Sequence, residues 1–175
     1  MSVHVVSVVP KRPATVAATP LDATLRAQFD ALRAVYPTEA TPSLVLPLLH
    51  CVQEQRGWVS EGDALMIAHY LGVPAVQVEE AASWYSMFRR APAGRHVVKV
   101  CRNIACSLRG AESVVAHLES RLGIKVGETT ADGRFTLQTV ECLASCGTAP
   151  AMQVNDTYHE QLTAERIDAI LGELS

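Results

Sequence analysis

The sequence has no long hydrophobic run and no cluster of basic residues. No apolar stretch approaches the roughly 20 residues that a membrane-spanning helix needs. Lys and Arg are scattered along the chain, and the formal net charge is only −3. A protein that binds nucleic acid usually shows a basic patch or stripe. These absences exclude a transmembrane helix and argue against DNA or RNA as a partner.

Two cofactor patterns and one targeting pattern are also missing. No glycine-rich nucleotide fingerprint follows a predicted strand, so nothing indicates that this chain binds NADH or flavin itself. No Cys-x-x-Cys pair occurs, which disfavours thiol–disulfide chemistry. The start, VHVVSVVPKRP, has its basic residues after the apolar part, the reverse of a signal peptide. We therefore expect a cytoplasmic protein.

The chain does have five cysteines and enough apolar residues for a real core. It contains 175 residues, of which 49% are hydrophobic, so it can form one domain or two small ones. The cytoplasm keeps thiols reduced. The cysteines are therefore expected to be ligands or redox groups, and not a disulfide framework.

The pattern of the chain changes twice. Residues 1–20 are rich in Val, Ala, Thr and Pro without an amphipathic period, and we expect an extended tail there. Residues 21–90 have helical periodicity and are expected to form a small helical bundle. The polar turn RRAPAGR then precedes a β-branched run, HVVKV, which is typical of a buried strand. Residues 91–175 are therefore expected to form a second domain.

The first domain contains several signals for helix starts, whereas the second contains signals for both strands and helices. Helices are expected to begin near Leu21, Thr41, Ser60 and Pro74. In the second domain the order is strand, helix, hairpin with its turn at Asp132–Gly133, second hairpin with its turn at Asn155–Asp156, and a helix begun at Thr163. This order fits a sheet with helices packed on it. The expected fold class is α+β, with an N-terminal helical bundle.

Four cysteines of the second domain form two closely spaced pairs. Four residues separate Cys101 from Cys106, and three separate Cys142 from Cys146. Both pairs are expected in loops that directly follow strands. If those two strands are neighbours in one sheet, the loops lie side by side and the four thiolates can converge.

Convergent thiolates can serve more than one purpose. Structural zinc sites usually use pairs with two to four residues between cysteines, so these spacings are permitted. A cluster of two irons is also held by four cysteines, and loops of small residues such as Ala144 and Gly147 let backbone N–H groups approach its sulfurs. Four unligated thiols are the third possibility. The fifth cysteine, Cys51, falls among apolar helical positions and is expected in the core.

The residues around these cysteines resemble a known family. CRNIACSLRG and VGETTADGRFTLQTVECLASCGTAPAMQVND are similar to the small [2Fe-2S] ferredoxin subunit of the NADH dehydrogenase module of respiratory complex I. PLLHCVQEQRGWVSEGDALMIAHYLGVP and WYSMF extend the resemblance from about residue 25 to the end. The resemblance implies a thioredoxin-like ferredoxin domain behind a helical docking domain. It also implies one [2Fe-2S] cluster ligated by Cys101, Cys106, Cys142 and Cys146.

The family resemblance implies a role inside an assembly. The chain is expected to exchange an electron with the FMN of a partner NADH-oxidising subunit, with FMN and NAD bound by that partner and no substrate site on this chain. Other peripheral-arm subunits are further expected partners, at the cytoplasmic side of the inner membrane. The equivalent subunit of an NAD-linked formate dehydrogenase or hydrogenase, and a zinc-stabilised scaffold, are the alternatives.

Three details qualify the family pattern. The family often has glycine where this chain has Ala144. Alanine can take the place of this glycine if the backbone φ at that position is negative. It usually has Thr-Phe at Ser83-Trp84, a change that we expect to affect packing only. Arg102 and Arg109 lie close to the first cysteine pair, where a cation favours reduction of the cluster. Arginine is mostly exposed in proteins, however, so a solvated surface position is the first expectation for both.

Overall fold

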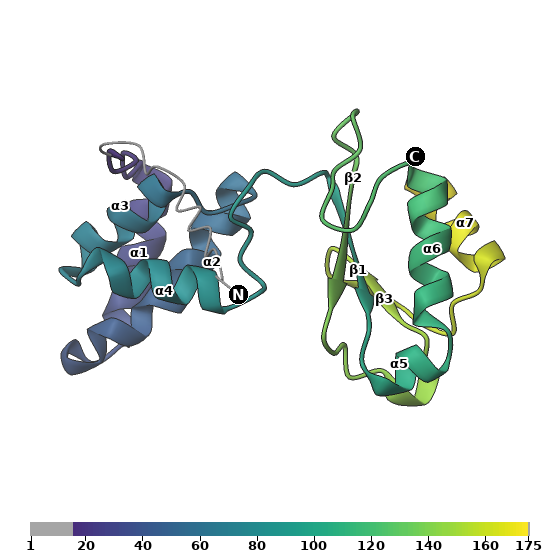
Figure 1. The fold of residues 1–175 in the computed structure, drawn as a ribbon. Helices are drawn as coiled ribbons and strands as arrows, with labels where there is room; N and C mark the ends of the chain where they lie inside the picture. Colours follow the sequence, from purple (N-terminus) through teal and green to yellow (C-terminus); the bar gives the residue numbers. More distant parts are fainter. Residues whose placement is uncertain (1–15, 175) are drawn as a thin grey trace, which may run out of the picture. The chain divides into compact units, whose positions relative to one another are not determined.

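The computed structural model describes residues 16–174, which divide into two compact units between Ala91 and Pro92. The first unit is helical, and the second combines a sheet with helices (Figure 1). Residues 1–15 of the expected tail lie outside the described residues. Residues 16–22 form neither helix nor strand, and the Thr19 N–H donates to the Gly62 carbonyl at 2.9 Å.

The first unit is built from helices, and the third of its α-helices carries clear end signals. They are α1 (Ala23–Val35), the 3-10 helix η1 (Thr38–Leu44), α2 (Val45–Arg56), α3 (Glu61–Leu71) and α4 (Ala75–Trp84). Ser60 and Asp63 form a reciprocal capping box at the start of α3, and Gly72 ends it with φ 69°. No helix formed by residues 16–174 is long and apolar enough to cross a bilayer.

The second helix begins later than the sequence predicts. We expected it to open at Thr41, but residues 38–44 form η1, which contains Pro42, and α2 starts only at Val45. Pro47 then lies in the first turn of α2, where backbone N–H groups lack helical partners and proline is tolerated.

The core of the first unit surrounds one buried carboxylate. Leu25, Phe29 and Ile67 are fully buried, and each such side chain contributes about 2 kcal/mol by leaving water. Asp63 is also buried, and it accepts hydrogen bonds from the Ser60 backbone and hydroxyl and pairs with Arg56. Its charge is therefore compensated inside the unit.

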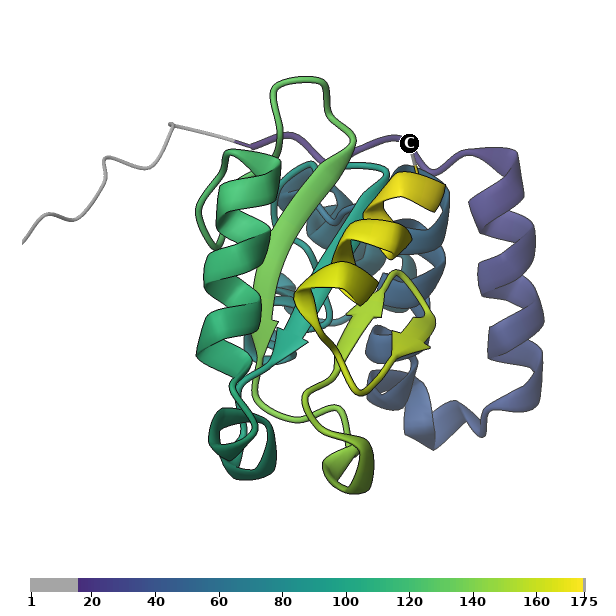
Figure 2. The same ribbon diagram turned by 90° about the vertical axis from the view of Figure 1, so that its right-hand side faces the viewer.

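The second unit is a four-stranded sheet with helices on one face. Its elements are β1 (His96–Cys101), α5 (Ile104–Leu108), α6 (Ala111–Leu122), β2 (Phe135–Val140), the 3-10 helix η2 (Cys146–Thr148), β3 (Met152–Val154), β4 (Thr157–His159) and α7 (Ala164–Glu173). The strand order is β2-β1-β3-β4, with β1 and β2 parallel and the other pairs antiparallel. Figure 2 shows α6 in green and α7 in yellow on the same face.

The core of this unit lies between the sheet and these two helices. Val98, Leu137 and Met152 are fully buried there with Leu118 of α6 and Ile167 of α7. Alternate residues of a strand point to the same face, which explains why β-branched and leucine residues recur along β1 and β2.

The two predicted hairpins have different outcomes. The turn at Asn155–Asp156 joins β3 to β4 as expected, with Asn155 at φ 51°. The turn at Asp132–Gly133 also forms, with Gly133 at φ 68°, but the chain before it pairs with β2 through one isolated bridge, between Thr129 and Thr136, and through single bonds such as that from the Thr130 N–H to the Phe135 carbonyl at 2.8 Å. The remaining contact there is irregular and includes the Gly127 N–H donating to the Leu137 carbonyl at 2.7 Å.

Candidate functional site

The strands that precede the two cysteine pairs are neighbours, which is the condition for the two cysteine segments to lie side by side. β1 and β2 are parallel, and their last register position sets Cys101 opposite Val140. The Arg102 N–H donates to the Val140 carbonyl at 2.9 Å, which extends the pairing by one bond. Both views show α5 and the segment around η2 side by side at the same end of the unit (Figures 1 and 2).

We had expected all four cysteines in loops, but the structure places some of them in regular elements. Cys101 is the last residue of β1, and Cys106 lies within α5. Cys142 is in irregular chain, and Cys146 is the first residue of η2. The turn of α5 forms because the Asn103 side chain accepts a hydrogen bond from the Ile104 N–H at 2.8 Å. The helix places Cys106 beside the strand end.

Cys101 and Cys106 form a buried thiol pair with 3% and 2% exposure. Burial raises the pKa of the Cys101 thiol, but the N–H groups of Asn103 and Leu143 and the Cys106 thiol outweigh it, so that this pKa is lowered from 9.0. Asn103 belongs to the first cysteine segment and Leu143 to the second. A single sulfur therefore interacts with backbone N–H groups from both segments, which favours its thiolate form.

The second cysteine pair is more open than the first. Cys142 and Cys146 are exposed, and the Cys142 sulfur accepts a hydrogen bond from the Ala144 N–H at 3.3 Å. Burial and the neighbouring Cys101 thiol raise the pKa of Cys106, and Cys146 lies close enough to raise it further.

Ala144 has a positive φ of 59°, so the condition under which alanine would fit without strain is not met. This left-handed conformation suits glycine and costs an alanine about 1 kcal/mol, because its Cβ crowds the backbone. In the same turn, the Ala144 N–H donates to the Cys142 sulfur. The turn between Cys142 and Cys146 is therefore formed at a local energetic cost.

Contacts with the segment before α7 fix the far end of this turn. The Thr148 hydroxyl donates to Glu160 at 2.7 Å, and the Gln161 N–H donates to the Thr148 carbonyl at 2.7 Å. The Leu162 N–H donates to the Pro150 carbonyl at 3.2 Å. The second cysteine segment is therefore anchored at β2 and again after η2.

One functional candidate was missed by the sequence reasoning. Glu141, directly before Cys142, accepts hydrogen bonds from the Nε and a terminal nitrogen of Arg102, the first at 2.9 Å. Arg102 lies at an exposed position, and its charge is paired with that of Glu141. The available signal was that each residue adjoins a cysteine of a different pair and the two have opposite charges.

The residues present fit a thiolate-held metal group by their chemistry. Within the described chain, no three His, Cys, Asp or Glu side chains are already grouped closely enough to hold a metal ion. Four thiols nevertheless lie on two adjacent segments at the end of β1 and β2, and they are surrounded by backbone N–H groups and small residues. This donor set suits an iron–sulfur cluster and also suits zinc.

Cys51 is less buried than we expected. It lies on α2 and packs against the helical core from a partly buried position. Burial, followed by the charge of Glu54, raises the pKa of its thiol. It belongs to the first unit, and the other four cysteines belong to the second.

Comparisons with known proteins agree with this arrangement. The chain is 44% identical over 148 residues to a subunit of NADH-quinone oxidoreductase from Rhizobium meliloti, covering 85% of this chain and 87% of that protein. It is 45% identical over 123 residues to the corresponding NADH-quinone oxidoreductase subunit of Escherichia coli, covering 70% and 74%.

A solved structure supports the fold. The crystal structure of NAD+-reducing [NiFe]-hydrogenase in the H2-reduced state aligns with a TM-score of 0.63 at 24% identity, over 75% of this chain and 22% of that chain. The family described as thioredoxin-like [2Fe-2S] ferredoxin matches residues 29–175. The resemblance found in the sequence is thus confirmed, and this chain belongs to the thioredoxin-like [2Fe-2S] ferredoxin family.

Proposed function

We propose that this chain is the electron-transfer subunit of an NADH:quinone oxidoreductase and holds one [2Fe-2S] cluster through Cys101, Cys106, Cys142 and Cys146. The main supporting observation is the parallel pairing of β1 with β2, which brings the two cysteine segments to the same end of the sheet. The relatives that are named as subunits of NADH-quinone oxidoreductase support the type of assembly.

The residues of the site have separable tasks in this proposal. The four thiolates are the ligands, with Cys101 and Cys106 held in buried positions and Cys142 and Cys146 on the open side. The N–H groups of Asn103, Leu143 and Ala151 interact with the buried sulfurs and stabilise their negative charge. When bound, the cluster supplies one-electron transfer.

The electron partner in this proposal is the FMN of an NADH-oxidising subunit, so FMN and NAD lie on that subunit and this chain has no substrate site. The helical unit is its docking surface, together with contacts to other peripheral-arm subunits. Large apolar side chains support docking there, because Trp84 of α4 is 81% exposed and Val76, Tyr85 and Met87 are also exposed. The assembly is then peripheral to the inner membrane on its cytoplasmic side.

The proposal is tested by mixing the purified chain with the NADH-oxidising, FMN-bearing subunit and adding NADH under anaerobic conditions. We expect the visible absorption of the cluster to bleach only when that subunit is present. The Cys142→Ser variant provides the matched control. A cluster that stays oxidised in the complete mixture contradicts the electron-transfer role.

The alternatives predict other results. A zinc-stabilised scaffold gives a colourless chain with one zinc per chain. The equivalent subunit of an NAD-linked hydrogenase or formate dehydrogenase would co-purify with a nickel or molybdenum enzyme. The similarity to a hydrogenase chain at 24% identity supports the shared fold only.

A further inference from the structure

Beyond the end of the sheet, buried residues of the two cysteine segments pack together, and the N–H groups of Leu143 and Ala151 interact with the sulfurs of Cys101 and Cys106. The last backbone bond between them runs from the Arg102 N–H to the Val140 carbonyl at 2.9 Å. Beyond it, the Cys101 thiol lies 3.8 Å from the Glu141 carbonyl oxygen. The side chains of Arg102 and Glu141 then form an ion pair across the same gap, with the Arg102 Nε 2.9 Å from the carboxylate.

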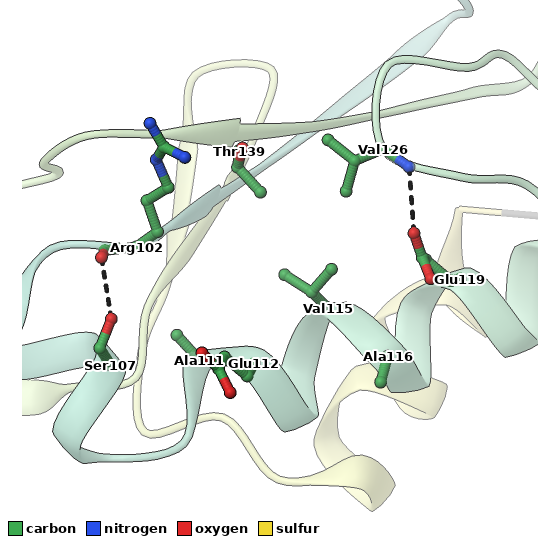
Figure 3. Close-up of a pocket in the computed structure, with 9 residues that line it drawn as sticks. All are labelled: Arg102, Ser107, Ala111, Glu112, Val115, Ala116, Glu119, Val126 and Thr139. Atoms are coloured by element: carbon green, nitrogen blue, oxygen red, sulfur yellow. Dashed lines mark hydrogen bonds between the residues drawn. The ribbon is translucent and has the colours of Figure 1, made fainter.

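Arg102 is also fixed on its other side. Its carbonyl accepts a hydrogen bond from the Ser107 hydroxyl at 2.9 Å, which ties the residue to α5. Figure 3 shows this bond and shows the guanidinium extending away from Ser107, beside a pocket of about 500 Å³ that Thr139 and Val115 also line. Arg102 therefore connects the helix that carries Cys106 to the segment that carries Cys142.

We propose that the Arg102–Glu141 ion pair positions the two cysteine segments for cluster binding. This inference rests on the proposed function. Arg102 adjoins Cys101 and Glu141 adjoins Cys142, so separating the pair lets one ligand segment move away from the other. Both residues are positioning residues, since they act through the adjoining cysteines.

The ion pair is expected to affect local opening of the two cysteine segments and not the global stability of the chain. The side chains are 60% and 74% exposed, and an exposed ion pair adds little to global stability. The turn at Ala144 already has an unfavourable backbone conformation. Local openings of such segments require far less free energy than global unfolding, so a weak pair changes how often they occur.

The test uses the full chain with its cluster and follows loss of visible absorption after an iron chelator is added. We expect Arg102→Gln and Glu141→Gln each to speed this loss about two- to fivefold, the range that one exposed ion pair allows. The double variant should lose the cluster no faster than either single variant. The charge exchange Arg102→Glu with Glu141→Arg should restore a rate close to that of the unchanged protein.

Arg109 provides the matched control. It lies near the same cysteine pair and is exposed, and within residues 16–174 its guanidinium has no ion pair. Arg109→Gln removes the same charge and should leave the rate of cluster loss unchanged. The thermal unfolding midpoint should also stay the same in all these variants, because the effect is local.

Reduction potentials separate positioning from simple charge effects. Arg102→Gln removes a cation and should lower the potential, whereas Glu141→Gln removes an anion and should raise it. Both variants should nevertheless lose the cluster faster than the unchanged protein. Opposite shifts in potential with the same change in retention identify a positioning pair.

Three results overturn the inference. They are unchanged rates in the single variants, equal acceleration by Arg109→Gln, and failure of the charge exchange to restore retention. An unchanged protein that binds no iron contradicts the proposed function itself and removes the basis of the inference. Iron-loaded protein with equal rates in every variant contradicts the positioning role alone.

Discussion

Cys101 and Val140 lie opposite each other at the last position of the parallel β1–β2 pair. Val140 is two residues before Cys142, so this pairing places the beginning of one cysteine segment beside the beginning of the other. The parallel direction is essential, because it brings the carboxyl ends of both strands to the same edge. The proposed ligand set depends on this single feature of the sheet.

Replacing a proposed ligand should remove the cluster. Cys142→Ser substitutes a hydroxyl, a harder and poorer ligand for this iron site, and should abolish or greatly weaken cluster binding. Visible absorption and the electron-spin signal of the reduced sample measure this. Cys51→Ser is the control and should retain the colour, because Cys51 lies on α2 in the other unit. Equal spectra for Cys142→Ser and the unchanged protein refute the ligand assignment.

Ala144→Gly should stabilise the turn between the second cysteine pair. Glycine avoids the penalty of about 1 kcal/mol for an alanine at φ 59°, and the extra entropy of the unfolded glycine offsets about half of this gain. We expect a net gain of about 0.5 kcal/mol and slower cluster loss. Ala149→Gly is the control, since Ala149 has φ −61° and should be destabilised by the change. Faster cluster loss in Ala144→Gly argues against a strained turn.

Trp84→Ala should affect docking without affecting folding. The side chain is 81% exposed, so the free energy of unfolding should change by less than about 0.5 kcal/mol. Loss of an aromatic interface anchor should weaken binding to the NADH-oxidising subunit about tenfold or more. Phe88→Ala, at a buried neighbouring position, should instead cost about 3 kcal/mol of stability. Unchanged affinity in Trp84→Ala removes α4 from the proposed interface.

Gly62→Ala should destabilise the first unit. An added Cβ would lie 2.6 Å from the Thr19 hydroxyl and 2.9 Å from the Ala17 carbonyl oxygen, so the segment lying across α3 must move. We expect a loss of about 1 kcal/mol in thermal or denaturant unfolding. Gly172→Ala is the matched control in α7, where nothing lies within 4 Å and alanine favours the helix. Equal stability changes for the two variants contradict the close contact at Gly62.

The contribution of Asp22 should depend on pH at the acidic end. The pKa of Asp22 is lowered from 3.8, mainly because its carboxylate accepts a hydrogen bond from the Leu25 N–H. Partial desolvation opposes this shift, and the side chains of Arg56 and Gln55 add to it. A lowered folded-state pKa gives stability that is complete above the unfolded value and is lost as pH falls through the folded value. The stability difference between the unchanged protein and Asp22→Asn should therefore shrink below about pH 4. A difference that is independent of pH contradicts this.

The sequence predicted elements that short-range signals define. Ser60 and Gly72 bound α3, Thr163 caps α7, and Asn155 forms the turn between β3 and β4. In each case one residue type supplies a cap or tolerates a turn conformation, so its position in the sequence is informative. The proximity of the two cysteine segments was predictable only on the condition that their strands pair.

Other features depend on contacts between distant residues or on very short elements. The five-residue helix α5 is too short for a hydrophobic period, so Cys106 was expected in a loop. The positive φ of Ala144 contradicts the usual preference of alanine. The pairing of Arg102 with Glu141 joins residues 39 positions apart, so it can be expected only once the two cysteine segments are known to lie together.

The most direct test of the ligand assignment is the iron and acid-labile sulfide content of anaerobically purified protein, measured with zinc in the same samples. The account predicts about two iron and two sulfide per chain, both lost in Cys142→Ser and kept in Cys51→Ser. One zinc per chain with no sulfide, or full iron content in Cys142→Ser, would contradict it.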